Sequence, residues 1–324
     1  MQRVALWLAL AGVLCPAGRS YELRGRLVPE SPAEVSLFGA TTPFHAETQA
    51  DAQGRFRFRD LSSGQYVVAV FIPGKGDVRR TIDLGPATAD AKGCLDLTIP
   101  VDDALGVSGE AIEDNSKVST GELSVPESAH REYEEAQRKL SRRDVTAAVE
   151  HLERAVAIAP QFAAAWNNLG IIAYQMRQYA RADSCFRKAL AQKPGSYEPL
   201  VNLGGVLLNE GKPAEALPYN RSAVRSRPHD ALANSQLGMN YFALRDLDSA
   251  QKYLDLAKRI DPAHFSYPQL TLARIHLLRD ERNQAAQELR DFLRLHPDAP
   301  ESVRIREQLT ALEKETGGPP VTPQ

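Results

Sequence analysis

Cysteine is scarce in this sequence, which has only Cys15, Cys94 and Cys185 in 324 residues. Small domains stabilised by disulfides carry several paired cysteines, so this composition excludes a disulfide framework. An excess of one charge sign is lacking too, because 39 Lys and Arg stand against 41 Asp and Glu, a formal net charge of −2. Without a basic surplus or a long Lys/Arg run, the chain has no general attraction to phosphate backbones, and we expect no nucleic-acid partner.

A hydrophobic run long enough to span a bilayer is not found at the N-terminus. The apolar stretch Val4–Leu14 has eleven residues, whereas a spanning helix needs about 20. Arg3 precedes this stretch and small residues follow it, which is the pattern of a secretory signal peptide. We interpret residues 1–20 as a signal peptide and expect export to the periplasm or the extracellular space, with envelope association possible. A retained anchor and a lipidated Cys15 are the alternatives.

Motifs of catalysis and metal binding are also missing from the sequence. It contains no His-Glu-x-x-His, no Cys-x-x-Cys, no Gly-x-Ser-x-Gly and no glycine-rich phosphate-binding loop. Ser249 and Lys252 have the spacing of a serine/lysine nucleophile pair, but no partner motif accompanies them. We therefore expect a protein that is not an enzyme and that uses no cofactor and no metal.

What the sequence does contain is an internal repeat. Prolines recur every 34 residues and then once after 35, at Pro160, Pro194, Pro228, Pro262 and Pro297. With each proline at repeat position 32, position 8 is always small: Ala136, Gly170, Gly204, Gly238 and Ala273. Positions 20 and 27 are mostly alanine. Small residues at these intervals let paired helices approach closely, so the pattern predicts about five stacked helical hairpins.

The repeat resembles the tetratricopeptide repeat (TPR) family, most clearly in Trp166-Asn167-Asn168-Leu169-Gly170 followed by Ala182, Phe186, Ala189 and Pro194. The resemblance covers slightly over half of the chain and implies an all-α solenoid over residues 128–316, closed by an amphipathic capping helix at 301–315. Residues 317–324 are expected to form a disordered tail. Pro218 departs from the family pattern, because a proline inside the second helix of a repeat should kink it.

The segment before the repeats has a different period. Residues 21–101 contain short runs that alternate apolar and polar side chains between Gly/Pro turns, which predicts a small all-β domain. The run Asp51-Ala52-Gln53-Gly54-Arg55-Phe56-Arg57-Phe58 resembles the carboxypeptidase regulatory-like, transthyretin-like domain. That resemblance implies a seven-stranded β-sandwich that acts as a non-catalytic accessory. We interpret the acidic residues 102–127 as an interdomain linker.

Stacked hairpins form a concave groove that binds extended peptides or helices of a partner protein. Position 6 of successive repeats carries amides that could pair with the backbone of an extended ligand, although such amides could equally serve local hydrogen bonding. Position 12 carries an apolar stripe, and one arginine lies on the same side. The residues expected to bind a partner are Asn168, Asn202, Gln236, Tyr174, Leu208, Phe242 and Arg274.

The sequence thus predicts a protein–protein interaction adaptor or scaffold that binds a protein or peptide ligand in the TPR groove. An alternative is that the β-sandwich binds a glycan or envelope polymer while the repeats assemble a complex. That alternative needs exposed aromatic side chains in the β domain, for which the candidates are Tyr21, Phe44, Tyr66 and Phe71.

Overall fold

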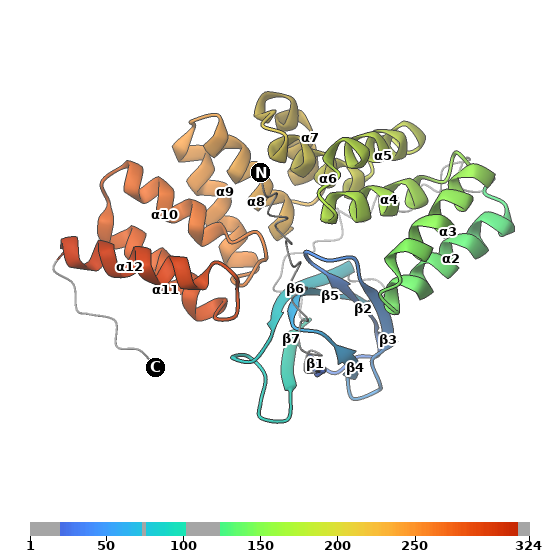
Figure 1. Ribbon diagram of the computed structural model, residues 1–324, viewed down its shortest axis with the longest axis horizontal. Helices are drawn as coiled ribbons and strands as arrows, with labels where there is room; N and C mark the ends of the chain where they lie inside the picture. The colour runs from blue at the N-terminus through green and yellow to red at the C-terminus, as the bar shows by residue number, and fades with distance from the viewer. Residues whose placement is uncertain (1–19, 73–75, 102–123, 317–324) are drawn as a thin grey trace, which may run out of the picture.

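The computed structural model describes residues 20–72, 76–101 and 124–316, and it contains a β domain followed by a solenoid of helices (Figure 1). The predicted signal peptide, most of the predicted linker and the predicted tail lie outside the described residues. Among the helices of the described ranges, none combines the length and the apolar character needed to cross a membrane.

The β domain has seven strands in two sheets. One sheet has the strand order β4-β1-β7, and the other has the order β3-β2-β5-β6. β1 pairs parallel to β7, whereas the remaining pairs are antiparallel. The strands are β1 (Tyr21–Val28), β2 (Glu34–Gly39), β3 (His45–Gln49), β4 (Arg55–Leu61), β5 (Gly64–Ile72), β6 (Gly76–Leu84) and β7 (Cys94–Pro100).

The core of the β domain follows from the alternation in the sequence. Leu23 and Leu27 of β1 are fully buried, as are Val68 and Val70 of β5, while the residues that alternate with them, Arg24, Arg26 and Ala69, are half-buried or exposed. Successive side chains of a strand point to opposite faces, so each sheet turns one apolar face inward. The all-β prediction for this segment is confirmed at the level of seven strands around one core.

The aromatic residues of the β domain are mostly used in that core. Tyr21, Phe44 and Tyr66 are 8% exposed or less, and only Phe71 of the four candidates is on the surface, at 53% exposure. The aromatic platform that glycan stacking would need is therefore not formed by these residues.

The solenoid consists of five helical hairpins and a final helix. The helices are α2 (Glu127–Ser141), α3 (Val145–Ile158), α4 (Ala163–Gln175), α5 (Tyr179–Gln192), α6 (Tyr197–Asn209), α7 (Pro213–Ser226), α8 (Ala231–Ala243), α9 (Leu247–Ile260), α10 (Pro268–Leu278), α11 (Arg282–Leu295) and α12 (Ser302–Thr316). Each hairpin pairs an even-numbered helix, the first helix of its repeat, with the following odd-numbered one.

The small residues of the repeat are required where the paired helices touch. A Cβ atom on Gly170 of α4 would lie 2.5 Å from the ring of Phe186 in α5, and one on Gly204 of α6 would lie 1.9 Å from the Asn220 amide in α7. The alanines at position 20 are fully buried in every repeat. The repeat therefore encodes the close approach of each helix pair, as predicted.

The ends of the solenoid differ from its middle. Ile305 and Leu309 of α12 are buried against α11, which confirms the capping helix, while Val303 on the other side of α12 is 65% exposed. At the opposite end, Val125 belongs to the first helical core. Pro218 is exposed and lies inside α7, beyond the first turn, and the helix continues past it.

Candidate functional site

The β domain lies on the inner side of the solenoid, within the arc that the helices describe (Figure 1). Contacts between the two parts come from loops and helix ends along the arc, including an ion pair at 3.9 Å between Arg79 of β6 and Glu198 at the start of α6. The inner surface, which the sequence predicts to bind a partner, is thus shared with a part of the same chain. Two contact zones carry this arrangement.

The first contact zone lies at the turns of the first two repeats. Arg143, in the α2–α3 turn, donates from Nη2 to the Tyr66 hydroxyl at 2.9 Å, and its guanidinium lies 4.6 Å from the centre of the Phe44 ring. Gln175, at the end of α4, donates from Nε2 to the Gly39 carbonyl at 2.9 Å. One arginine therefore holds the β domain by stacking and by a hydrogen bond at once.

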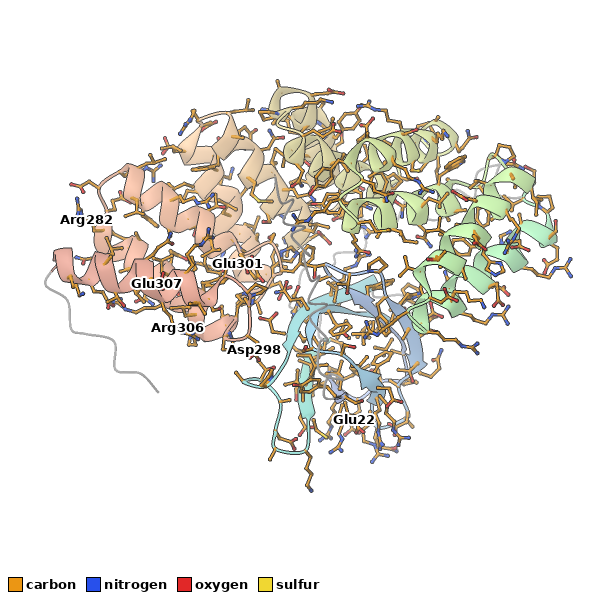
Figure 2. The ribbon with its side chains drawn as sticks, in the orientation of Figure 1. Glu22, Arg282, Asp298, Glu301, Arg306 and Glu307 are labelled. Carbon is orange, nitrogen blue, oxygen red and sulfur yellow. The ribbon has the colours of Figure 1, made fainter. Side chains whose placement is uncertain are left out.

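The second contact zone covers the edge strand β6. Asp261 accepts a hydrogen bond from the Thr81 amide at 3.0 Å, and Asp298 accepts one from the Ala87 amide at 2.9 Å. His296 Nδ1 lies 2.7 Å from Asp83 Oδ2, with both side chains buried. Figure 2 shows Asp298 where the loop before α12 meets the β domain. An uncovered edge strand is prone to pair with other chains, so the solenoid protects β6.

Burial sets the electrostatics of this second zone. Desolvation lowers the pKa of the fully buried His264 despite the nearby Asp261 and Asp230, so the neutral imidazole is favoured. Desolvation also raises the pKa of Tyr267, which keeps its hydroxyl protonated. Burial thus favours the neutral form of both His264 and Tyr267 in this contact zone.

The predicted amide ladder makes contacts between neighbouring helices. Asn168 donates from Nδ2 to the Tyr133 hydroxyl at 3.0 Å, and Asn202 donates from Nδ2 to Asn167 Oδ1 at 3.3 Å. Gln236 is only 6% exposed, and its Oε1 has no hydrogen-bond partner within the described part of the chain. Asn168 and Asn202 thus link one repeat to the next in this structure.

The predicted apolar stripe divides into two parts. Tyr174 accepts a hydrogen bond from Asn209 Nδ2 at 2.9 Å, and burial raises its pKa. Leu208 is half-buried and packs against the same helical core as Tyr174. Phe242 and Arg274, by contrast, lie together at a depression between the fourth and fifth repeats.

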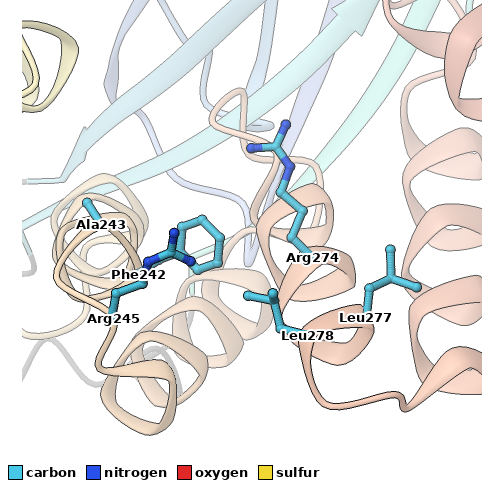
Figure 3. Close-up of a pocket in the computed structure, with 6 residues that line it drawn as sticks. All are labelled: Phe242, Ala243, Arg245, Arg274, Leu277 and Leu278. Carbon is cyan, nitrogen blue, oxygen red and sulfur yellow. The ribbon is translucent and has the colours of Figure 1, made fainter.

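This depression, called the hollow below, is lined by Phe242, Ala243, Arg245, Arg274, Leu277 and Leu278. Its volume is about 520 Å³ and it is open to solvent. Leu277 and Leu278 at the end of α10 are 47% and 56% exposed. Figure 3 shows Phe242 from the end of α8 and Leu278 from α10 on facing sides of the hollow. Apolar side chains left this exposed next to one another are typical of an interaction site.

Two cations border the hollow without an acidic partner. No carboxylate among the described residues lies within 4.0 Å of the Arg245 or Arg274 guanidinium, and both side chains are exposed. Their neighbours differ, because Arg279 pairs with Asp248 and Arg282 pairs with Asp280. The hollow therefore combines an apolar floor with two unneutralised guanidinium groups.

The sequence reasoning identified Phe242 and Arg274 but missed Arg245. A signal for Arg245 was present, since the same position in the turn between the two helices of a repeat is an arginine in three of the five repeats: Arg143, Arg177 and Arg245. All three have positive φ angles near 60°, a backbone conformation that non-glycine residues seldom adopt.

The side chains that could bind a metal or act as a nucleophile are not brought together into a site within the described ranges. No group of three or more His, Cys, Asp or Glu side chains there is placed to hold a metal ion. Cys94 and Cys185 are buried in different parts of the chain. Ser249 lies at the start of α9, where its amide donates to the Asp246 carboxylate that caps the helix.

Comparison with known proteins agrees with the helical architecture. The tetratricopeptide repeat family model matches residues 133–197, 170–231 and 201–264. Anaphase-promoting complex subunit 3 of Schizosaccharomyces pombe is 24% identical over 156 residues, which are 48% of this chain and 23% of that protein. BBSome complex member BBS4 of Mus musculus is 29% identical over 109 residues, which are 33% of this chain and 21% of that protein. The match thus spans about a fifth to a quarter of these relatives.

Among solved structures, PilW, described as a widely conserved type IV pilus biogenesis factor, superposes with a TM-score of 0.53 at 19% identity. The superposition covers 59% of this chain and 89% of PilW. At this level of identity the similarity concerns the fold of the helical part. Together with the 34-residue period and the hairpin geometry, the family match shows tetratricopeptide repeats within residues 133–264.

Proposed function

We propose that this protein is a non-catalytic scaffold that binds a protein partner on the part of the solenoid's inner side that its own β domain leaves uncovered. The observation that carries this proposal is the hollow, where Phe242, Leu277 and Leu278 stay accessible beside Arg245 and Arg274. Buried apolar and aromatic side chains with flanking arginines supply most of the binding energy in protein interfaces.

The other predicted groove residues have a supporting role in this proposal. Asn168, Asn202 and Tyr174 bind neighbouring helices, and Gln236 is buried between them. They fix the spacing of the repeats, and through it the shape of the surface that the partner meets. We further propose that the β domain is the transthyretin-like accessory suggested by its sequence, and that it braces the solenoid from within.

The proposal includes export of the mature chain, which rests on the N-terminal sequence pattern. Sequencing the N-terminus of the protein recovered from its native source tests this part. A mature N-terminus close to residue 20, found outside the cytoplasm, supports export. An intact Met1 on a cytoplasmic protein would contradict it.

Site-specific photo-crosslinking tests the binding site itself. A photoreactive amino acid is placed at Leu278 in the hollow and, as a matched control, at Val303, which is also an exposed apolar side chain but lies on α12. We expect a crosslinked partner protein from Leu278 and none from Val303. Partner capture that is equal at both positions, or confined to Val303, would place binding away from the hollow and overturn the proposal.

The alternative, glycan binding by the β domain, has weaker support. Three of its four candidate aromatic side chains are in the core, and Phe71 alone is exposed. A single ring offers little surface for stacking a sugar polymer. Glycan-array binding that is abolished by Phe71→Ala would nevertheless favour this alternative over the scaffold.

A further inference from the structure

One repeat turn of the solenoid already binds an aromatic side chain of the same chain, and this contact shows how another turn can bind a partner. In the first repeat, Arg143 lies over the Phe44 ring and donates to the Tyr66 hydroxyl. Stacking on a ring and donation to an oxygen are the two interactions that a planar guanidinium can make together. The turn arginine thus binds an aromatic side chain with an oxygen acceptor close by.

The same position recurs at the hollow. Arg245 follows Arg143 by 102 residues, which is three repeats of 34, and it has the same left-handed backbone, with φ 67° against 60°. Yet the Arg245 guanidinium stacks on no ring and donates to no oxygen within the described part of the chain. It stands exposed next to the apolar floor of Phe242 and Leu278.

Arg274 sets a second requirement for a ligand that binds in the hollow. Its guanidinium borders the same hollow from α10 and has no acidic partner among the described residues. A carboxylate is the side chain that an unpaired guanidinium binds best, through two parallel hydrogen bonds. A ligand that fits the hollow therefore needs an anionic group that pairs with Arg274. It also needs an aromatic ring that stacks on Arg245 and packs against the two leucines.

We propose that the hollow binds a segment of a partner protein in which an aromatic residue lies next to an aspartate or glutamate. The ring rests against Leu277 and Leu278 beneath the Arg245 guanidinium, and the carboxylate pairs with Arg274. This inference depends on the proposed scaffold function and specifies the chemistry of its partner. An aromatic ring has the apolar area that the leucines leave unburied, whereas a free anion or a purely acidic segment would leave them exposed.

Selection from a random peptide library tests the inference with no assumption about the natural partner. Displayed 12-residue peptides are selected on the purified chain from residue 21 to residue 324. We expect enrichment of Phe, Tyr or Trp within three positions of Asp or Glu. Fluorescence anisotropy of the enriched peptides then measures their affinity for variants of the chain.

Charge reversal separates the hollow from general electrostatic attraction. The double variant Arg245→Glu with Arg274→Glu should weaken binding of the selected peptide by at least tenfold. The control Arg259→Glu with Arg304→Glu reverses two exposed arginines on α9 and α12 and should leave the affinity unchanged within twofold. Circular dichroism and thermal melting confirm that both double variants keep the fold.

Single substitutions distinguish the roles of the two arginines. Arg245→Lys keeps the charge but loses the planar group, so affinity should fall for aromatic peptides. A peptide whose acidic residue is replaced by lysine should bind the Arg274→Glu variant better than it binds the wild type. Rescue of this kind requires a direct contact between the peptide charge and position 274.

Several results would overturn the inference. They are enrichment of basic peptides, enrichment without aromatic residues, and equal loss of affinity in both double variants. If photo-crosslinking at Leu278 captures a partner while the selection shows no aromatic–acidic preference, the scaffold function stands and this inference fails. If crosslinking captures nothing from the hollow, the scaffold proposal itself fails.

Discussion

His296 Nδ1 lies 2.7 Å from Asp83 Oδ2, and this contact joins the loop before α12 to the edge strand β6 across 213 residues of sequence. The His296 side chain is fully buried and that of Asp83 is 6% exposed. A buried polar pair holds its elements together only while both partners are present, because the remaining one is left unsatisfied when the other is removed.

Replacing Asp83 should therefore loosen the β domain from the solenoid. We expect Asp83→Ala to lower the free energy of unfolding by about 3 kcal/mol, since it leaves His296 buried without its partner. Chemical denaturation measures the loss, and limited proteolysis reports earlier cleavage between the two parts. Asp83→Asn keeps a hydrogen-bonding oxygen and should lose less, so an equal loss in both variants would contradict this account.

His45 should make the stability of the β domain depend on pH. Desolvation lowers its pKa from 6.5 to about 4, although Glu34 acts in the opposite direction and Glu47 Oε1 lies 3.1 Å from its Nε2. Because the folded-state pKa is the lower one, the unfolded chain binds the proton more readily. Stability is complete above pH 6.5 and falls as the pH drops toward 4, by on the order of 3 kcal/mol for this group.

A variant that lacks only the His45 imidazole isolates this contribution. The His45 ring stacks on Phe38 with ring centres 4.7 Å apart, and His45→Phe keeps a stacked ring without a titrating group. Thermal melting of both proteins between pH 4 and pH 7 should show a smaller loss for the variant. Parallel curves would mean that His45 is protonated equally in the folded and unfolded chains.

Gly170 should not tolerate a methyl group. Helix propensity alone predicts that Gly170→Ala stabilises α4 by about 1 kcal/mol. The added Cβ would lie 2.5 Å from the ring of Phe186, which is only 1% exposed and cannot move without disturbing the core. We expect a net loss of about 1–3 kcal/mol in denaturant unfolding. A gain in stability would show that the helix pair has room that this structure does not show.

Pro218 should lower the free energy of unfolding of the solenoid. It is exposed inside α7 and cannot donate the backbone hydrogen bond that a helix interior requires. We expect Pro218→Ala to raise the free energy of unfolding by up to about 3 kcal/mol. Pro213 at the first position of the same helix is the matched control, because a proline there loses no helical bond and Pro213→Ala should change little.

The repeat made the helical half of the fold predictable. The spacing of Pro160 and its successors placed each hairpin, and the small residues at position 8 identified where paired helices meet. Alternation of side chains did the same for β1 and β5. These features are local, because each depends on residues within one repeat or one strand.

The position of the β domain was not predictable in this way. The hydrogen bond between the Asp261 carboxylate and the Thr81 amide joins residues that are 180 positions apart. Neither residue type indicates from the sequence which residue it will bind. The roles of Asn168 and Asn202 depended on the neighbouring helices, which offer their amides partners before any ligand does. The hollow, too, depends on the packing of two successive repeats, because its lining comes from the end of α8, the turn that follows it and α10.

Repeat solenoids behave mechanically like springs, because each repeat contacts only its neighbours and small rotations add up along the array. In this protein the β domain bonds to the turn of the first repeat through Arg143 and to the loop before α12 through His296 and Asp298. Because the β domain connects the two ends of the solenoid, it restricts the bending motion that changes the distance between them. A partner at the hollow therefore meets a surface whose curvature is already set, and little conformational entropy is lost when it binds.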